Sequence, residues 1–467
     1  MNEKQKKTLK IMLLILLVFI FLFNSYFLIP GKYRKTAEKY LESAVYFPSD
    51  LLSFYGKTIV VFAPHCDDEV LGCGGLIKKA VSAGAKVHIV LITNGEGFKY
   101  AVEAKFLKVT PSVENYIDFA RIRQKESLSA LKHLGIDPKN IFFLGYPDRG
   151  IARMWETNWG RDNPFYSPYT KNYSSLYENS FTKNTPYSGE ALFSDIEKIL
   201  KITGPDIIYI PHTMDAHPDH WAANCFITAA VEKEKHGKKP RVLAYLVHRG
   251  NWPYPSGIHT SLALIPPKIL QKTGTQWEIL PLGELVAREK LAAIKEYKTQ
   301  LLFMKNYLFS FARKNEVFGA YPGVKIKNME TNMTGEIVIK NPSGDTMKKK
   351  TEKDCAIDKI CAYKYNGNLY ITVKTVKNIS GKTRITLFLT LFYGENKLKR
   401  KEITYDCGMR ENNDALKRFT VLRNKNMATF IIPLKQINNP RKIFLGAKSY
   451  NGKSLVDRTS YRMLILE

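Results

Sequence analysis

This chain has few cysteines and no internal repeats. Six cysteines among 467 residues are too few for a disulfide scaffold. We expect Cys66, Cys73 and Cys225 to be small buried residues. Cys355 and Cys361 lie close enough in the sequence for either one disulfide or two free thiols. The absence of repeats argues against a repeat architecture.

Acidic residues are also scarce, since 43 of them face 71 lysines and arginines and leave a net charge of +28. Such a charge suits nucleic acid, anionic lipid or an anionic cell-wall polymer. The lysines are scattered, and no RNA-binding or helix-turn-helix signature is present, so we expect no nucleic-acid partner. Hydrophobic residues make up 45% of the chain, which excludes a disordered protein.

The N-terminus carries a localisation signal. A basic tail, "MNEKQKKTLK", precedes the charge-free run "IMLLILLVFIFLFNSYFLIP", and 20 residues at about 1.5 Å each span a hydrocarbon core of about 30 Å. No A-x-A-like cleavage site follows, which favours an uncleaved anchor over a signal peptide. We therefore expect residues 1–34 to be a tail and a single transmembrane helix. Basic residues flank the run on both sides, and the short basic tail favours placing the rest of the chain outside the cell.

Short apolar runs alternate with helical patterns between residues 50 and 305. We expect strands at 57–64, 86–93, 140–147 and 205–212, and helices at 71–83, 117–134, 189–203 and 218–235. Continuous apolar strands separated by helices indicate a mostly parallel sheet covered on both faces. The prediction is an α/β fold with a doubly wound, Rossmann-like sheet in three layers, which binds ligands beyond the carboxyl ends of its strands.

The pattern changes from about Met329. "NLYITVKTV" and "TRITLFLTLFY" alternate with period two, and further short strands are expected near Phe430, Phe444 and Leu464. This pattern predicts an antiparallel β-sandwich over residues 330–467. It contains no catalytic constellation, so we expect it either to bind carbohydrate or cell wall or to serve a structural role.

Two polar motifs each directly follow an apolar strand. "PHCDDE" supplies His65, Asp67, Asp68 and Glu69, before glycines that we expect to let the chain turn into a helix. "PHTMDAHPDH" supplies His212, Asp215, His217, Asp219 and His220. Pro218 suits the first turn of a helix, which places His217 and His220 at its entry.

A lone histidine at a strand end usually packs or donates a hydrogen bond, and a lone acidic run usually starts a helix. Two such loops at the same edge of one sheet instead predict a shared cation. Two imidazoles, one carboxylate and an open position fit a catalytic Zn²⁺ ion better than magnesium or calcium, which prefer oxygen ligands.

These motifs together resemble the PIG-L/LmbE-like zinc-dependent N-acetylglucosamine deacetylases, over roughly residues 57–305. "TNGE" at 93–96, "RQKESLSALKHLGI" from Arg123, "FLGYPD" at 143–148 and "KLAAIKEYKTQ" at 290–300 are also similar to segments of that family. The resemblance implies a metal-dependent hydrolase of linear amides. Its substrate would be an N-acetylglucosamine-containing glycan or glycoconjugate, with metal-bound water as the nucleophile.

The resemblance also implies roles for individual residues. His65, Asp68 and His220 correspond to the zinc ligands, Asp67 to the general base, and Arg123 to an arginine near the substrate pocket. His217 corresponds to the group that stabilises the oxyanion or protonates the leaving amine. We expect it to be cationic, with Asp219 orienting it and raising its pKa.

Three further residues follow strands at the same edge. His248 in "YLVHRGNWPYP" is either a substrate-binding or a structural residue, and Asp148 and Asp215 are further candidates. The polar, aromatic segment from Gly150 to about Thr185 is expected to be a long insertion loop. Its tryptophans and tyrosines either stack on sugar faces or pack the loop against the body.

One residue departs from the family pattern, because Cys66 stands where proline is usual. Successive side chains of an extended segment point to opposite sides, so we expect Cys66 to face away from the metal. Two other functions stay open: a non-catalytic surface protein that binds glycans, and a zinc amidase acting on another small conjugate. The presence of both Asp67 and His217 favours an enzyme.

Overall fold

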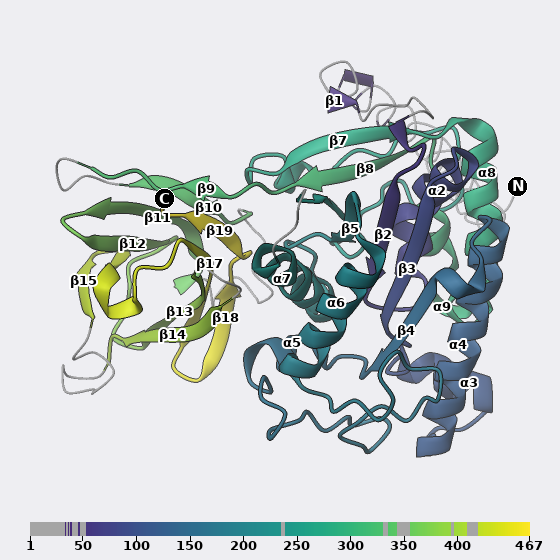
Figure 1. The fold of residues 1–467 in the computed structure, drawn as a ribbon, viewed down its shortest axis with the longest axis horizontal. Helices are drawn as coiled ribbons and strands as arrows, with labels where there is room; N and C mark the ends of the chain where they lie inside the picture. Colours follow the sequence, from purple (N-terminus) through teal and green to yellow (C-terminus); the bar gives the residue numbers. More distant parts are fainter. Residues whose placement is uncertain are drawn as a thin grey trace, which may run out of the picture.

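A mostly parallel sheet forms the centre of the protein (Figure 1). The computed structural model describes residues 33, 36, 38, 39, 45, 46 and 53–467, except 235–238, 330–334, 343–354, 394–396 and 409–418. The strands of this sheet are β1 (Val45–Tyr46), β2 (Thr58–Ala63), β3 (Lys86–Thr93), β4 (Ile141–Tyr146), β5 (Ile207–Pro211), β6 (Arg241–Tyr245), β7 (Gln276–Pro281) and β8 (Asn315–Ala320).

The strand order is β1-β7-β8-β6-β5-β2-β3-β4. Neighbouring strands run parallel except at β8, which is antiparallel to both β6 and β7. The predicted α/β class is thus confirmed, but β7 and β8 are additions that the sequence patterns did not indicate. Because β8 belongs to this sheet, the sheet extends to Ala320, beyond residue 305 where we expected this part of the chain to end.

Helices cover both faces of the sheet. They are α2 (Asp68–Ser82), α3 (Lys99–Phe106), α4 (Val113–His133), α5 (Ile151–Glu156), α6 (Gly189–Thr203), α7 (Pro218–Lys233), α8 (Gly283–Ile294) and α9 (Lys298–Phe309). Alternate residues of β2 point to opposite sides. Val61 therefore joins a core with α2, α4, α8 and α9, whereas Val60 joins one with α5, α6 and α7.

The glycines after the first motif lie inside α2 and do not form the turn that we expected. A Cβ atom on Gly72 would lie 2.3 Å from the ring of Tyr245, and one on Gly75 would lie 2.3 Å from Leu282. The glycines thus allow α2 to pack closely against β6 and against the residues before α8. Close packing, and not a change of chain direction, is the reason for glycine here.

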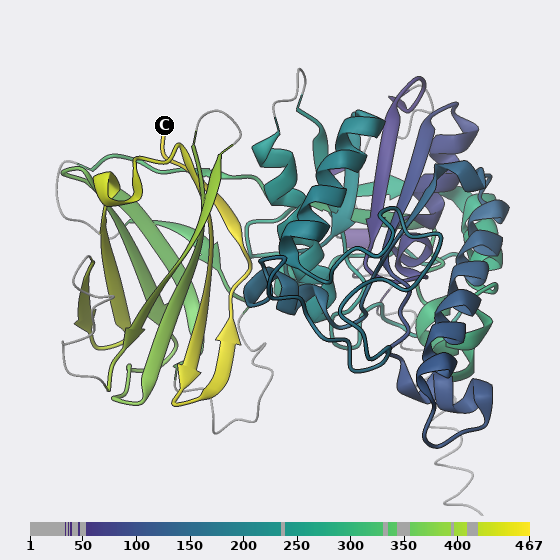
Figure 2. The same ribbon diagram turned by 60° about the horizontal axis from the view of Figure 1, so that its bottom comes forward.

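Residues from Val324 onward form two further sheets, seen beside the first in Figures 1 and 2. One has the order β10-β11-β12-β16-β15 and the other β14-β13-β17-β19-β9, with β18 pairing with β17. Their strands are β9 (Val324–Lys325), β10 (Glu336–Lys340), β11 (Ile357–Tyr365), β12 (Asn368–Thr375), β13 (Thr383–Phe392), β14 (Leu398–Asp406), β15 (Thr420–Asn424), β16 (Met427–Pro433), β17 (Lys442–Asn451), β18 (Ser454–Arg458) and β19 (Arg462–Ile465).

The pairing in these two sheets, here called the C-terminal sheets, is antiparallel except between β19 and β9. Ile371 and Val373 of β12 share one buried cluster with Leu387 and Leu389 of β13, so the two sheets enclose a common core. This agrees with the period-two pattern. Cys355 and Cys361 are not joined in a disulfide with each other.

Aromatic and basic side chains join the C-terminal sheets to α5 and α7. The guanidinium of Arg400 on β14 lies 4.6 Å from the ring centre of Trp155 and 4.2 Å from that of Trp159. The ring of Tyr461 stacks on Trp221 of α7 at 6.2 Å, and Arg458 lies 4.2 Å from the same indole. The two parts of the chain therefore share a buried, partly charged interface.

The expected membrane anchor lies outside the described residues. Within the described part of the chain, no helix is both long and apolar enough to cross a membrane. Tyr33, three residues after the charge-free run ends at Pro30, is described and donates a hydrogen bond from its hydroxyl to the carbonyl oxygen of Ala263, at 2.9 Å.

Replacing Arg400 with alanine should lower the free energy of unfolding by about 1–2 kcal/mol, because it removes two partly buried cation–π contacts and a hydrogen bond to the Trp155 carbonyl. Lys399→Ala is the matched control, since Lys399 is the exposed neighbour on the same strand. Urea unfolding followed by tryptophan fluorescence measures both variants. Equal stability of the two would contradict the role given to Arg400.

Candidate metal centre

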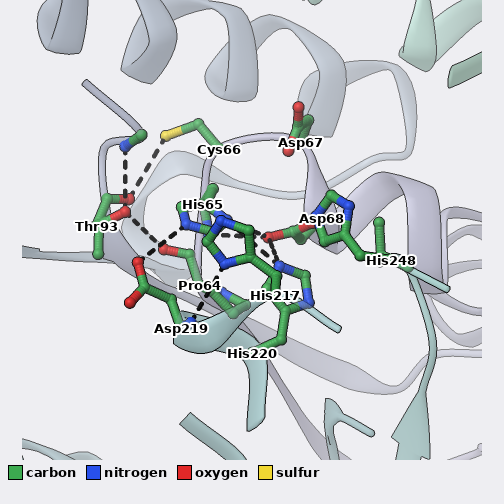
Figure 3. A network of polar contacts seen from close by, with 12 residues as sticks. Pro64, His65, Cys66, Asp67, Asp68, Thr93, His217, Asp219, His220 and His248 are labelled. Carbon is green, nitrogen blue, oxygen red and sulfur yellow. Dashed lines mark hydrogen bonds and ion pairs between the residues drawn. The ribbon is translucent and has the colours of Figure 1, made fainter. Parts of the chain in front are cut away.

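The two predicted motifs meet at one edge of the central sheet. The first follows β2 and the second follows β5, and these two strands are parallel neighbours. Parallel strands end at the same edge, so the loops after them lie side by side although they are far apart in the sequence. The convergence predicted from the two motifs is confirmed (Figure 3).

Three ligand atoms form a tight triangle there. His65 Nδ1 and Asp68 Oδ2 are 3.0 Å apart, Asp68 Oδ2 and His220 Nε2 are 3.0 Å apart, and the two ring nitrogens are 3.4 Å apart. Ligands of a tetrahedral zinc ion at about 2.0–2.1 Å lie roughly 3.3–3.4 Å from one another. The spacing and chemistry of this set therefore fit a zinc ion.

Carboxylates contact the outer nitrogens of both histidines. His65 Nε2 lies 3.3 Å from Asp148 Oδ1 and 3.3 Å from Asp219 Oδ2, and His220 Nδ1 lies 3.2 Å from Asp215 Oδ2. A carboxylate in this position fixes the tautomer and the ring orientation of a ligating histidine. Burial alone would lower the pKa of His220, but Asp215 and Asp68 raise it to about 9.

His217 and His248 border the same space. The ligand atoms of His65, His217 and His220 all lie within 4.8 Å of one another, and so do those of Asp68, His220 and His248. Both bordering histidines are only half-buried, in contrast to His65 and His220. They are therefore the imidazoles at the accessible side of the centre.

Asp67 has a strained backbone and a constrained side chain. Its φ of 141° is a conformation that residues other than glycine rarely adopt, at a cost on the order of 1–3 kcal/mol. Its amide donates to Glu69 Oε2 at 2.9 Å, and its own Oδ2 lies 3.1 Å from Arg123 Nη2. Glu69 also accepts from Ser127 and Tyr297, at 2.7 Å each, so α4 and the start of α9 brace this turn.

Burial raises the pKa of Asp67 to about 8, although the Arg123 guanidinium acts in the opposite direction. In the chain without a metal, this carboxyl group therefore holds its proton near neutral pH. A divalent cation beside it would favour the ionised form.

Arg123 is buried, with 4% of its surface exposed. Its guanidinium donates to the carbonyl oxygen of Gly95 at 2.8 Å and to that of Cys66. A Cβ atom on residue 95 would lie 1.7 Å from Arg123 Nη1, which explains the glycine. The described contacts of Arg123 are thus with the two loops and Asp67. Its place near the substrate pocket stays a prediction.

Asp219 does not orient His217 in the way that we expected. Its carboxylate accepts from the amides of Arg149 at 2.6 Å and Ile151 at 3.1 Å and lies against His65. Only its backbone N–H reaches His217, donating to Nδ1 at 3.2 Å. The reason is local, because His217 is the N-cap of α7 and receives a free amide of the first turn.

The same geometry makes His217 neutral, where we expected a cation. Burial and the imidazoles of His65, His220 and His248 lower the pKa of His217 well below its usual range. Because Nδ1 accepts the Asp219 amide, the ring proton resides on Nε2. His217 thus offers an N–H donor without a charge.

Cys66 faces away from the ligands, as expected. Its Sγ lies 4.0 Å from the carbonyl oxygen of Thr93 on the neighbouring strand, and Figure 3 shows it directed away from the histidines. Burial raises the pKa of its thiol, which keeps it protonated. Cys66 is therefore a packing residue beneath the loop.

His212 opens the second motif but belongs to the core. Its Nε2 lies 3.1 Å from Thr275 Oγ1, its Nδ1 accepts from the Met214 amide at 3.1 Å, and its ring stacks on Trp277 at 5.1 Å. Burial lowers the pKa of His212 to about 4. A histidine with both nitrogens engaged in this way is structural.

Tyr307 is a neighbour of the centre that the sequence did not indicate. Its hydroxyl donates to the carbonyl oxygen of Val247 at 2.8 Å and lies 3.4 Å from His248 Nδ1, and the two rings stack. Tyr307 lies on α9 with no motif around it, so only the tertiary structure reveals it.

The segment after β4 contains α5 and otherwise irregular chain up to α6. Trp155 is buried, and Trp159 is half-buried and stacks on Phe226 at 5.8 Å. Tyr166 and Tyr173 are exposed. Packing of the loop against the body, one of the two alternatives, therefore accounts for both tryptophans.

One protein-family model matches the part of the chain that contains this candidate centre. Residues 60–231 match the family model described as PIG-L: GlcNAc-PI de-N-acetylase. These residues belong to the PIG-L family. The matched part, here called the PIG-L segment, contains the three residues of the triangle together with Asp67 and His217.

Two curated proteins are similar to part of this chain. A glucosamine-6-phosphate deaminase-like protein of Bacteroides thetaiotaomicron is 26% identical over 216 residues, which are 42% of this chain and 31% of the relative. A 1D-myo-inositol 2-acetamido-2-deoxy-alpha-D-glucopyranoside deacetylase of Mycobacteroides abscessus is 27% identical over 182 residues, which are 38% of this chain and 56% of the relative.

Among solved structures, the N,N'-diacetylchitobiose deacetylase of Pyrococcus horikoshii is similar with 19% identity and a TM-score of 0.36, covering 56% of this chain and 82% of that one. The chain spans only about a third to a half of the length of the two curated relatives.

Removing one ligand should remove the metal from the PIG-L segment. The purified full chain in detergent should contain about one zinc ion, and His220→Ala should lose most of it because two ligands rarely retain zinc. His133→Ala, on the exposed surface of α4, is the matched control. Elemental analysis measures both, and an unchanged zinc content in His220→Ala would refute the ligand assignment.

His212 should make the protein sensitive to acid. Its folded pKa of about 4 lies below the unfolded value of about 6.5, so its contribution to stability is complete above pH 6.5 and is lost as the pH falls toward 4. Between pH 7 and pH 5 the loss amounts to about 2 kcal/mol. Thermal unfolding at the two pH values should therefore differ less in His212→Gln than in the unsubstituted chain. The same difference in both would contradict the assignment.

Proposed function

We propose that this protein is a zinc-dependent deacetylase that hydrolyses the N-acetyl group of an N-acetylglucosamine-containing glycan or glycoconjugate. The observation that carries the proposal is the triangle of His65, Asp68 and His220 atoms, with Asp67 and His217 beside it. Membership of the PIG-L family supports an amide hydrolase. The name of the Mycobacteroides relative describes a deacetylase of an acetamido sugar, which supports the substrate class.

His65, Asp68 and His220 would hold the zinc ion. When bound, zinc supplies a Lewis acid that polarises the amide carbonyl and lowers the pKa of water to about 7. The carboxylates of Asp148, Asp219 and Asp215 keep both imidazoles in the tautomers that ligation requires.

Asp67 would act as the general base. It adjoins Asp68 but contacts Arg123 and Glu69, so it is left free to take a proton from the attacking water. Its pKa of about 8 before a metal binds lies near the working pH, and a nearby cation lowers it into the range of a useful base. Arg123 and Glu69 act as positioning residues for this carboxylate.

His217 would stabilise the oxygen of the substrate carbonyl as negative charge develops on it. Its neutral ring donates through Nε2–H, and the Asp219 amide on Nδ1 fixes that tautomer. A donor held in place before the reaction contributes on the order of 10²–10³ in rate. His248, stacked on Tyr307, is a candidate for contact with the sugar or the acetyl group.

The rest of the chain would place this chemistry at a membrane. We infer that residues 1–34 form a single-pass anchor and that the catalytic part lies outside the cell, where an anionic cell-wall polymer suits the net charge of +28. We interpret the C-terminal sheets as the accessory β-sandwich of residues 330–467, and residues 50–305 as the core of the Rossmann-like deacetylase domain.

Asp67→Asn should keep the zinc ion but abolish acetate release, because asparagine cannot accept the proton. Asp118→Asn, on the exposed surface of α4, is the matched control and should remain active. Acetate is measured with the full chain on peptidoglycan, poly-N-acetylglucosamine and a lipid-linked N-acetylglucosamine.

Release from at least one of these substrates is the expected result, and it also identifies the substrate class. An active Asp67→Asn variant would remove Asp67 as the base. No release from any substrate by a zinc-loaded chain would overturn the proposed reaction.

A further inference from the structure

Two apolar side chains project almost completely into solvent at the end of α3. Leu107 is 92% exposed and Val109 is 86% exposed. Leu107 also has a positive φ of 52°, in the left-handed region that favours glycine. Lys105 and Lys108 flank them. A turn that only connected two helices would need neither the exposed apolar side chains nor a residue other than glycine at this positive φ.

The apolar surface continues on α9. Leu302 is 66% exposed, and its neighbour Phe303 is also exposed. The ring of Phe303 meets that of Phe98, at the start of α3, with centroids 5.7 Å apart. The exposed sides of α3 and α9 are therefore adjacent.

A loop after β6 extends the same surface. Tyr254 and Ile258 are exposed, and the amide of Gly257 between them donates to the carbonyl oxygen of Asn306 on α9 at 3.0 Å. We call the six exposed residues on these three segments the apolar strip: Leu107, Val109, Leu302, Phe303, Tyr254 and Ile258.

Tyr33 contacts the far end of this strip. The ring of Tyr33 lies 6.2 Å from that of Tyr254, and its hydroxyl is bonded to Ala263. Tyr33 is the third residue after Pro30, the last residue of the charge-free run.

We propose that the apolar strip docks onto the surface of an anionic lipid bilayer. Lysine is depleted at the centre of protein–protein interfaces but is favoured beside anionic lipids, and Lys105, Lys108, Lys298 and Lys305 lie exposed among the apolar residues. The charge-free run, which in the sequence ends three residues before Tyr33, is long enough to span a bilayer and favours the same partner.

Docking would turn the metal centre toward the bilayer surface. The loop that carries Tyr254 also carries His248, and α9 carries Tyr307, which stacks on that histidine. Phe98 directly follows Gly97, whose amide donates to Asp148 Oδ2 at 2.8 Å. Each segment of the strip thus leads directly to a residue at the centre. The docking itself does not depend on the proposed reaction.

The test measures contact with lipid at single positions of the full chain reconstituted in vesicles. Leu107→Cys carries an environment-sensitive fluorophore, and the vesicles contain phosphatidylglycerol and a lipid with a spin-label quencher near the headgroup. Leu422→Cys is the matched control, because Leu422 is 55% exposed on β15 of the C-terminal sheets, at the opposite end of the molecule (Figure 1). The labelled unsubstituted chain gives the background from native cysteines.

We expect the lipid quencher to reduce the signal at position 107 by about half or more and to leave that at position 422 near background. Lys105→Gln with Lys108→Gln should reduce the quenching at position 107 about threefold or more at low salt. Equal quenching at positions 107 and 422 would overturn the proposal, as would quenching at 107 that neither phosphatidylglycerol nor the lysines affect. Because the measurement needs no turnover, an inactive protein that still docks would separate failure of the reaction from failure of the surface.

Discussion

Buried negative charge is the constraint on which this structure depends. Seven carboxyl groups with less than a tenth of their surface exposed surround or support the centre: Asp67, Asp68, Glu69, Glu96, Asp148, Asp215 and Asp219. Arg123 is a buried, permanently charged cation that contacts one of them, Asp67, directly. Charges of one sign at this density in a poorly solvated interior require opposite charge or protons. Here the imidazoles of His65 and His220 lie between carboxylates and supply part of that positive charge. A divalent cation bound among these groups would balance the remaining negative charge better than added protons would.

This constraint explains features that seem unrelated in the sequence. The strained φ of Asp67 directs one acid of the "DDE" run to Arg123 while its neighbour Asp68 faces the histidines. Gly95 has no side chain because a guanidinium occupies the space. The N-cap of α7 is a histidine, so the free amide of that helix is satisfied by the same ring that borders the metal site.

The sequence predicted the parts of the fold that rest on local patterns. Helix α6 begins and ends where its apolar spacing indicated, and the two loops converge because both follow strands of a parallel sheet. The three candidate ligand positions came from the resemblance to the PIG-L/LmbE-like family, and the structure brings their atoms together. Their roles in catalysis remain a prediction that the geometry supports.

Contacts between distant segments could not be predicted in the same way. Nothing around Asp219 shows that its carboxylate lies against His65, because the amides of Arg149 and Ile151 that hold it come from another loop. His212 resembles a ligand in the sequence and becomes a core residue only through Thr275 and Trp277. Strands β7 and β8 have short, mixed sequences whose pairing depends on their neighbours.

Because Tyr461 and Arg458 both pack on Trp221, the C-terminal sheets cannot be separated from α7 without exposing that indole. Trp221 directly follows His220, so one helical turn carries both a candidate metal ligand and the attachment point of the C-terminal sheets. The two regions are therefore not interchangeable modules. A chimaera that exchanged the C-terminal sheets for those of another protein would have to restore the packing around the Trp221 indole. Without that packing, the helical turn that carries His220 would lose its support, and the candidate metal centre would become less rigid.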